Sequence, residues 1–197
     1  MTEGSAYDPL EDVLLAQMDR PPELQDVNPR TLSPFQRALL VIDGTVTKLV
    51  EAYMMEPLRI VRLKQDKRTL AAPHRWLGVD TGATVATRHV LLRGEHTDEL
   101  YAYATSLVAL ERVPESLRSG IERDGGGLGR ILDASKLETR REILWYGRER
   151  LEDLPWEPES GGQDFLTRTY RVILAGEPIL LIKEHFPLGN RLLPKHH

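Results

Sequence analysis

Hydrophobic and polar residues alternate with a period of two along six stretches of the chain, a pattern typical of half-buried β-strands. The expected strands cover residues 58–63, 84–93, 100–110, 138–146, 165–174 and 178–186. Short turns at 94–98 and 175–177 favour hairpins. Because helices do not alternate with these strands, the pattern predicts an α+β fold with a six-stranded antiparallel sheet.

Hydrophobic residues at helical spacing predict short helices before and between the strands. The first begins at Ser33, where Pro34 suits the first helical position and Gln36 completes a capping box. A second helix is expected after Thr45, and a third between the third and fourth strands. A fourth is expected to start at Leu128.

Two charged residues are expected on the inner, apolar faces of their strands. Alternation places Arg88 and Glu184 among hydrophobic neighbours. A buried charge without a partner costs several kcal/mol, so each must have a partner, a ligand or water. One interpretation is a structural Arg–Glu pair. The other is a closed pocket in which the arginine binds an anion and the glutamate handles a hydroxyl or a proton.

The other polar residues are weaker candidates for a functional site. His185 is expected to face outward, and Arg140, Arg141 and Arg168 are expected on solvated sheet surface. The glycine run 125–127 precedes a helix start, where backbone N–H groups suit an anion. It lacks the Gly-Lys-Ser/Thr ending of a phosphate loop, which argues against nucleotide binding.

Composition narrows the class of protein. The chain has 197 residues, a net charge of −4 and no cysteine, which excludes disulfides and thiolate chemistry. No apolar run approaches the roughly 20 residues that span a bilayer, and the acidic balance disfavours nucleic acid. The histidines lack metal-ligand spacing, so no metal site is expected. We expect a cytoplasmic protein without membrane insertion.

Charge is distributed unevenly along the chain. Residues 1–30 contain seven acidic and two basic residues and four prolines. This composition predicts a partly ordered acidic arm with a single helical turn that docks. The expected organisation is this arm at 1–30, one domain at 31–190 and a tail at 191–197.

Five segments in order resemble the chorismate–pyruvate lyase superfamily, especially its branch of short bacterial, archaeal and plastid proteins that includes 4-hydroxybenzoate synthases. Together they cover about residues 32–188. The segments are LSPFQR (32–37) with DGTVTK (43–48), TRHVLL (87–92), SLV (106–108) with ERVP (111–114), LGRIL (128–132) with ETRRE (138–142), and RTYR (168–171) with GEPILLIKEHF (176–186).

The resemblance implies an antiparallel sheet whose ligand is enclosed by helical flaps. It also implies a reaction that removes the enolpyruvyl group of chorismate as pyruvate and leaves 4-hydroxybenzoate. At the matching positions, Arg88 would bind the ring carboxylate, and Glu184 would contact the 4-hydroxyl as the catalytic group. Backbone N–H groups of Val46 and Leu128 would complete the pocket.

Arg168, Arg171 and Arg140 also match basic positions of the family, and the resemblance implies that one of them would bind the enolpyruvyl carboxylate. Elimination that creates an aromatic ring is strongly downhill, so no cofactor is expected. The product is a precursor of quinones such as ubiquinone and of aromatic secondary metabolites. A monomer or a homodimer is expected.

The same fold also serves as an effector-binding domain of bacterial transcription regulators, so a module that binds a small anion is the alternative. Such regulators carry a winged-helix domain, and the 32 residues before Ser33 are too few and too acidic for one. A related lyase that makes another hydroxybenzoate is a third interpretation.

Overall fold

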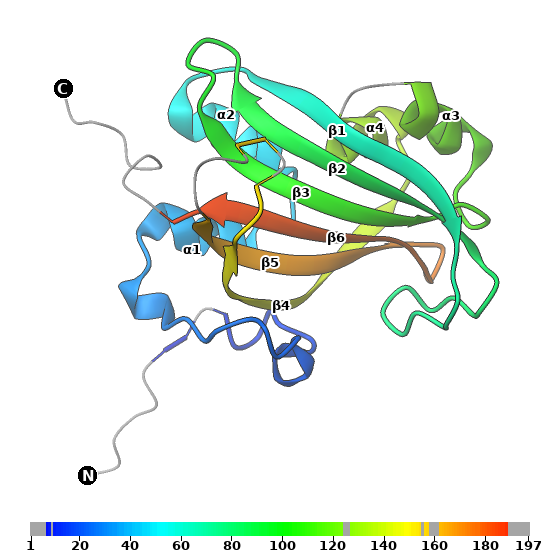
Figure 1. The fold of residues 1–197 in the computed structure, drawn as a ribbon, viewed down its shortest axis with the longest axis horizontal. Helices are drawn as coiled ribbons and strands as arrows, with labels where there is room; N and C mark the ends of the chain where they lie inside the picture. The colour runs from blue at the N-terminus through cyan, green and yellow to red at the C-terminus, as the bar shows by residue number, and fades with distance from the viewer. Residues whose placement is uncertain (1–6, 9, 124–126, 155, 158–161, 189–197) are drawn as a thin grey trace.

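A six-stranded antiparallel sheet in the order β1-β2-β3-β6-β5-β4 forms the centre of the molecule (Figure 1). The computed structural model describes residues 7–8, 10–123, 127–154, 156–157 and 162–188. The expected fold class is confirmed. The strands are β1 (Leu58–Thr69), β2 (Thr84–Gly94), β3 (Leu100–Ala109), β4 (Thr139–Leu151), β5 (Gln163–Leu174) and β6 (Glu177–Pro187).

Strands β1 and β4 extend beyond their predicted ends. The predicted strand 58–63 continues to Thr69, and the predicted strand 138–146 continues to Leu151. The added residues are mostly polar, so hydrophobic alternation does not reveal them. Both extensions are paired with a neighbouring strand. Thr69 at the end of β1 lies opposite Thr84 of β2, and Leu151 at the end of β4 lies opposite Gln163 of β5.

Four helices lie on one face of the sheet, behind it in Figure 1. Helix α1 begins with the predicted capping box, in which the Ser33 hydroxyl accepts from the Gln36 N–H and the Gln36 side chain accepts from the Ser33 N–H. Thr45 is the N-cap of α2, as expected, although its side chain makes no capping hydrogen bond. The helices are α1 (Pro34–Val41), α2 (Val46–Met54), α3 (Glu115–Arg123) and α4 (Leu128–Ser135).

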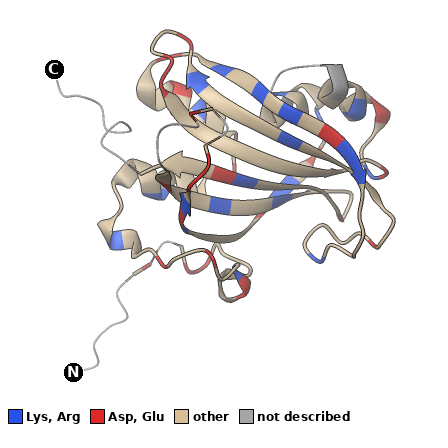
Figure 2. Cartoon of the chain, viewed as in Figure 1, with Lys and Arg blue, Asp and Glu red and all other residues tan. Residues whose placement is uncertain are grey.

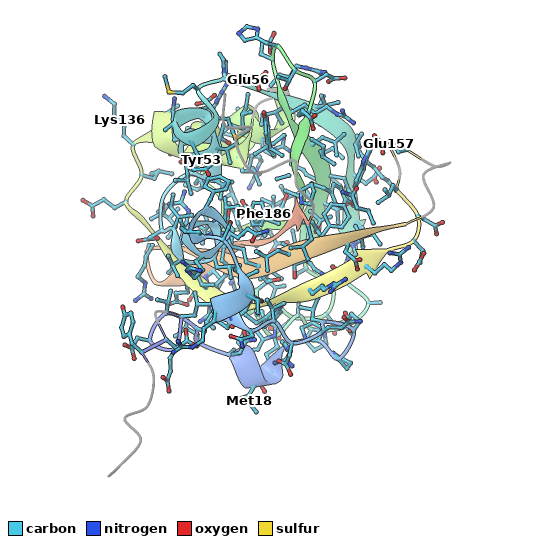
Figure 3. All side chains as sticks on the ribbon, turned by 90° about the vertical axis from the view of Figure 1, so that its left-hand side faces the viewer. Met18, Tyr53, Glu56, Lys136, Glu157 and Phe186 are labelled. Atoms are coloured by element: carbon cyan, nitrogen blue, oxygen red, sulfur yellow. The ribbon has the colours of Figure 1, made fainter. Side chains whose placement is uncertain are left out.

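The hydrophobic core fills the space between these helices and the inner face of the sheet. Helices α1 and α2 pack with Leu92 and Phe186, and Figure 3 shows Phe186 inside the fold. Helices α3 and α4 pack with Val108 and Leu180. The inner face predicted from alternation in β2 and β6 is therefore the buried one.

The acidic arm is docked along the edge strand β4. The N–H groups of Leu15 and Ala16 donate to β4 carbonyls at 2.9 Å, and Gln25 pairs with Arg148. Leu24 is buried, whereas Met18 points into solvent (Figure 3). Figure 2 shows the acidic residues of this arm, whose helical turns are η1 (Gln17–Asp19) and η2 (Pro29–Thr31). Glycines 125 and 126 and the tail 191–197 lie outside the described residues.

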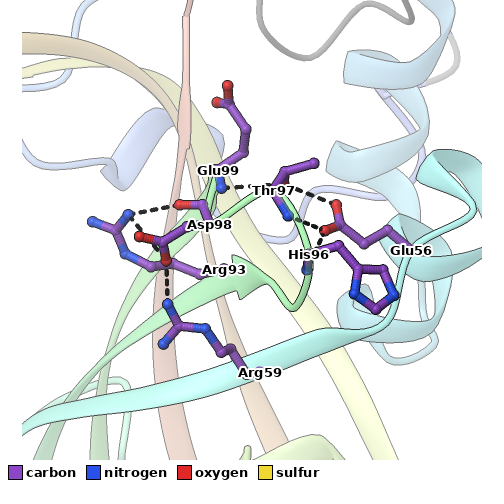
Figure 4. Close-up of polar contacts among 7 residues, drawn as sticks. All are labelled: Glu56, Arg59, Arg93, His96, Thr97, Asp98 and Glu99. Atoms are coloured by element: carbon purple, nitrogen blue, oxygen red, sulfur yellow. Dashed lines mark hydrogen bonds and ion pairs between the residues drawn. The ribbon is translucent and has the colours of Figure 1, made fainter.

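A buried carboxylate fixes the end of α2 to the turn between β2 and β3 (Figure 4). The Glu56 carboxylate accepts from the N–H groups of His96 (2.8 Å) and Thr97 (2.7 Å), from the Thr97 hydroxyl (3.0 Å) and from the Tyr101 hydroxyl (2.8 Å). A Cβ on Gly94 would lie 2.5 Å from this carboxylate, so only glycine fits there. The contact thus sets the position of α2.

The same hydrogen bonds change the acidity of Glu56. Burial alone would raise its pKa, but the donors from Thr97, Tyr101 and His96 outweigh burial and lower the pKa to about 2. A carboxylate whose pKa is lower in the folded state stabilises the fold above its unfolded pKa of about 4.5. That stabilisation is lost as the pH falls from about 4.5 toward about 2.

Glu56→Gln is expected to lower the free energy of unfolding by about 2 kcal/mol at pH 7, because the amide leaves buried donors without an acceptor. The difference from wild type should shrink at pH 3, where the wild-type carboxylate has lost part of its contribution. Urea unfolding at both pH values measures it. Glu95→Gln, at an exposed position of the same turn, is the control. Equal losses for the two variants would contradict this role for Glu56.

Candidate functional site

An inner cavity lies between the sheet and the first turns of α2 and α4. Its volume is about 60 Å³, enough for several water-sized groups, so it suits a compact ligand. Strands β1 to β6 and the loops before α2 and α4 all contribute to its wall. The lining residues are Thr45, Val46, Thr47, Ile60, Arg88, Val90, Leu92, Ala104, Ser106, Gly127, Leu128, Gly129, Arg141, Tyr170, Ile182 and Glu184.

Arg88 places a guanidinium in the wall of this cavity. It lies on β2 opposite Ser106 of β3, and only 1% of its surface is exposed. Val90 and Leu92 follow it on the same face and also line the cavity. A buried guanidinium beside apolar neighbours attracts an anion strongly, because little water screens its charge.

Glu184 is held by two side chains of the neighbouring strand β5. Arg168 lies directly opposite it, and its Nε donates to Glu184 Oε2 at 2.7 Å. The Tyr170 hydroxyl donates to Glu184 Oε1 at 3.2 Å, and its ring lies 4.9 Å from the Arg168 guanidinium carbon. All three residues are buried. Both carboxylate oxygens are therefore oriented, and the ion pair satisfies the charge of Glu184.

The Tyr170 hydroxyl remains a hydrogen-bond donor at neutral pH. Burial raises the pKa of Tyr170, and the adjacent Glu184 carboxylate raises it further. The phenol therefore stays protonated, and a protonated phenol can donate to the carboxylate.

Two helix N-termini face the cavity. The first N–H groups of a helix have no intrahelical acceptor, and the helix dipole makes this end positive. Val46 begins α2 and Leu128 begins α4, and both line the cavity. The helices meet closely, since a Cβ on Gly129 would lie 2.7 Å from the Thr45 methyl carbon. Arg130 strengthens this contact by an ion pair with Glu51 of α2 at 2.8 Å.

Arg140 and Arg141 take different places at the start of β4. Arg141 lines the cavity, and its Nη1 donates to the Asp43 carbonyl at 2.8 Å. Arg140 lies outside the cavity, pairs with Glu142 and has a side chain that is 70% exposed. The structure thus brings four of the expected site residues to one cavity, namely Arg88, Glu184, Val46 and Leu128. Arg141 joins them there. Arg140, a candidate from the family resemblance, does not line the cavity.

Arg168 is not on solvated surface, which corrects the expectation from its strand. It is 1% exposed, and its Nη1 also donates to the Ile42 carbonyl at 2.9 Å. Every residue of β5 from Phe165 to Tyr170 is buried, so both faces of this strand are covered. Alternation cannot separate inside from outside in such a strand.

His185 is buried as well, contrary to the expectation that it faces outward. It does lie on the outer face of the sheet, but aromatic rings cover it there. The Tyr103 ring is stacked 5.2 Å from the imidazole, and Phe165 packs edge-on at 5.9 Å. His185 Nε2 lies 2.8 Å from a Glu149 oxygen. His185 is therefore not among the residues that line the inner cavity.

A second, larger cavity of about 400 Å³ lies on the outer face of the sheet, between the arm and residues such as Thr105, Trp145 and Lys183. The ammonium of Lys183 is already paired with Glu149 at 2.7 Å. Only the inner cavity combines buried charges with two helix N-termini, among the described residues. Buried and oriented charges are the usual mark of a functional site, so the inner cavity is the candidate.

The described part of the chain holds no group of three or more His, Cys, Asp or Glu side chains that could bind a metal ion. None of its helices is long and apolar enough to cross a membrane. The chemistry that the cavity itself offers is recognition of an anion by guanidinium and N–H groups, with an oriented carboxylate beside it.

Comparison with known proteins identifies a family that matches most of the chain. A family described as "Chorismate pyruvate-lyase Rv2949c-like" matches residues 40–192. A chorismate pyruvate-lyase of Mycobacterium tuberculosis (strain CDC 1551 / Oshkosh) is 30% identical over 173 residues, covering 83% of this chain and 84% of the relative. A chorismate pyruvate-lyase of Mycobacterium leprae (strain TN) is 26% identical over 164 residues, covering 80% and 76%.

Solved structures share the fold. PhnF from Mycobacterium smegmatis has a TM-score of 0.51 at 17% identity, and the similarity covers 75% of this chain and 65% of PhnF. The chain therefore spans about two thirds of that protein. The effector domain of PhnF alone has a TM-score of 0.51 at 16% identity, with 75% and 90% covered. At these identities the likeness concerns the fold alone.

Arg168→Met is expected to destabilise the protein by about 3–5 kcal/mol, because it leaves the Glu184 carboxylate buried without its cation. Adding Glu184→Gln should recover at least about 1 kcal/mol by removing the unpaired charge. Arg59→Met, which breaks an exposed ion pair with Asp98, should cost at most about 1 kcal/mol. Urea unfolding of the four proteins measures these values. A double variant less stable than Arg168→Met would refute the coupling.

Proposed function

The chain belongs to the Rv2949c-like chorismate pyruvate-lyase family, and on this basis we propose that it converts chorismate to 4-hydroxybenzoate and pyruvate. The observation that carries the proposal is that one cavity contains both a buried cation and a buried carboxylate. A buried guanidinium, Arg88, and a buried, oriented carboxylate, Glu184, both line the cavity, and they come from the two strands that flank β3.

The spacing of these two groups suits a six-membered ring. Arg88 is opposite Ser106, and Glu184 is opposite Ala104, both on β3. Two strand spacings across the sheet and two residues along it separate their Cα atoms by about 12 Å. A ring with a carboxylate at one end and a hydroxyl at the other fits between the two side chains.

Arg88 is proposed to bind the ring carboxylate with its guanidinium fork. The N–H groups at the starts of α2 and α4, at Val46 and Leu128, are proposed to donate to the ligand from above. Helix dipoles favour an anion at these ends. The helices also exclude water, which strengthens the electrostatic contacts inside the cavity.

Glu184 is proposed to accept a hydrogen bond from the ring hydroxyl. In the reaction, the ether bond between the ring and the enolpyruvyl group breaks. The carbon that bears the hydroxyl loses its hydrogen, and the ring becomes aromatic. The enolpyruvyl group gains that hydrogen and leaves as pyruvate. Glu184 either relays this hydrogen as a proton or orients the substrate for its direct transfer.

Arg168 and Tyr170 are proposed as positioning residues for this carboxylate. They hold both Glu184 oxygens through bonds of 2.7 and 3.2 Å. Arg168 therefore has a different role from the one suggested by the family pattern, because its charge is already paired with Glu184. A fixed carboxylate is worth more to catalysis than a mobile one, since no reorganisation is needed during the reaction.

A second candidate function is binding of a small anion without turnover, which the shared fold with the PhnF effector domain supports. A lyase that yields another hydroxybenzoate isomer is a third. We propose a cytoplasmic protein that acts as a monomer or a homodimer, with its product passing to the synthesis of quinones or other aromatic compounds.

Incubation of the purified protein with chorismate, followed by chromatography beside hydroxybenzoate isomers and a pyruvate assay, tests the function. We expect equimolar 4-hydroxybenzoate and pyruvate above the spontaneous background. A rise in melting temperature with chorismate but no turnover would support the binding module instead. A different isomer would keep the cavity and change the product.

Arg88→Gln should reduce kcat/KM roughly 100-fold, because it removes the charged partner of the ring carboxylate. Glu184→Gln should reduce kcat roughly 100-fold or more, while leaving the affinity for 4-hydroxybenzoate within about tenfold of wild type, because the amide still accepts from the hydroxyl. Glu138→Gln, at an exposed position, is the control. Steady-state kinetics and calorimetry measure the constants. Wild-type turnover by Glu184→Gln would remove Glu184 from the mechanism.

A further inference from the structure

Arg141 is a cavity residue whose charge has no acidic partner in the part of the chain that the structure describes. Among the described residues, no carboxylate lies within ion-pair distance of its guanidinium, and its recorded hydrogen bond goes to the neutral Asp43 carbonyl. The neighbouring Arg140 is paired with Glu142, and Arg168 is paired with Glu184. Arg141 thus offers a positive charge at the cavity that no carboxylate of the described residues neutralises.

The wall of the cavity contains two guanidinium groups in addition to the buried Arg168–Glu184 pair. These groups belong to Arg88 and Arg141. Under the proposed function the substrate carries two carboxylates and the aromatic product carries one. A second carboxylate in a closed cavity would cost several kcal/mol without a cation of its own.

The two guanidinium groups come from strands near opposite edges of the sheet. Arg88 lies on β2 and is almost completely buried, whereas Arg141 lies at the start of β4, with three strands between them, and is only half-buried. Arg141 contacts the loop between α1 and α2 through Asp43, immediately before α2 begins. It therefore lies at the side of the cavity that is closed by the α1–α2 loop.

We propose, resting on the proposed function, that Arg141 binds the second carboxylate of the substrate, the one on the enolpyruvyl group, and so distinguishes the dianionic substrate from the monoanionic product. On binding, the guanidinium exchanges the Asp43 carbonyl for a carboxylate. A charge-assisted, two-pronged bond is stronger than a bond to a neutral carbonyl. When pyruvate leaves after the reaction, Arg141 loses this contact. The aromatic product then contacts Arg88 but not Arg141.

Arg141→Gln tests this assignment, with Arg140→Gln as the matched variant one residue away and outside the cavity. The KM for chorismate and the inhibition constant for 4-hydroxybenzoate are measured for each. Arg141→Gln is expected to raise KM at least tenfold and to leave the inhibition constant within about threefold. Arg140→Gln should change both by less than threefold. Arg141→Lys, which keeps the charge without the fork, should give an intermediate KM.

An equal loss of both constants in Arg141→Gln, or no change in either, would overturn the assignment, as would a larger effect of Arg140→Gln. Melting temperatures show whether each variant is folded. If the wild type does not turn chorismate over, the proposed lyase function fails, and the same comparison is made with dissociation constants from calorimetry. If Arg141→Gln then loses affinity for chorismate but not for 4-hydroxybenzoate, the result still supports Arg141 as the site of the second carboxylate. If the wild-type protein binds neither acid, the assignment is refuted.

Discussion

The buried ion pair between Arg168 and Glu184 is the interaction on which the rest of the site depends. Removing two charges from water is costly, and the pair repays that cost only with good geometry and further hydrogen bonds. Cross-strand register supplies the geometry, and the Tyr170 hydroxyl and the Ile42 carbonyl supply the additional bonds. Replacing such a pair by hydrophobic residues is often neutral or stabilising. Its presence in the wall of a cavity is therefore better explained by function than by stability.

Covering this pair requires contributions from distant parts of the chain. The α1–α2 loop is fixed by Arg168 and Arg141. The far end of α2 is fixed by the Glu56 carboxylate, which accepts hydrogen bonds from the turn between β2 and β3. Helix α4 is fixed to α2 by Arg130. The cover of the cavity is thus attached to the sheet at several points, and each attachment uses a side chain that satisfies a backbone carbonyl, an N–H group or a carboxylate.

Alternation is informative where one face of a strand differs from the other. In β2 it correctly placed Arg88 on the inner face, and in β6 it did the same for Glu184. It failed for Arg168, because β5 is covered on both faces. The burial of His185 depends on aromatic rings from other strands, and the place of Arg141 at the cavity depends on the α1–α2 loop. Both are contacts distant in sequence, so alternation within one strand could not predict them. The family resemblance pointed to Arg140, which the structure places outside the cavity, and to Arg168, which the structure pairs with Glu184.

A crystal structure of the protein with 4-hydroxybenzoate tests the central claim most directly. The account predicts the ring in the inner cavity, with its carboxylate on Arg88 and its hydroxyl on Glu184, beneath the first turns of α2 and α4. The Arg141 guanidinium should remain on the Asp43 carbonyl, because the product lacks the second carboxylate. Density for the acid only in the outer cavity beside Trp145, or a reversed ring with its carboxylate on Arg141, would contradict the account.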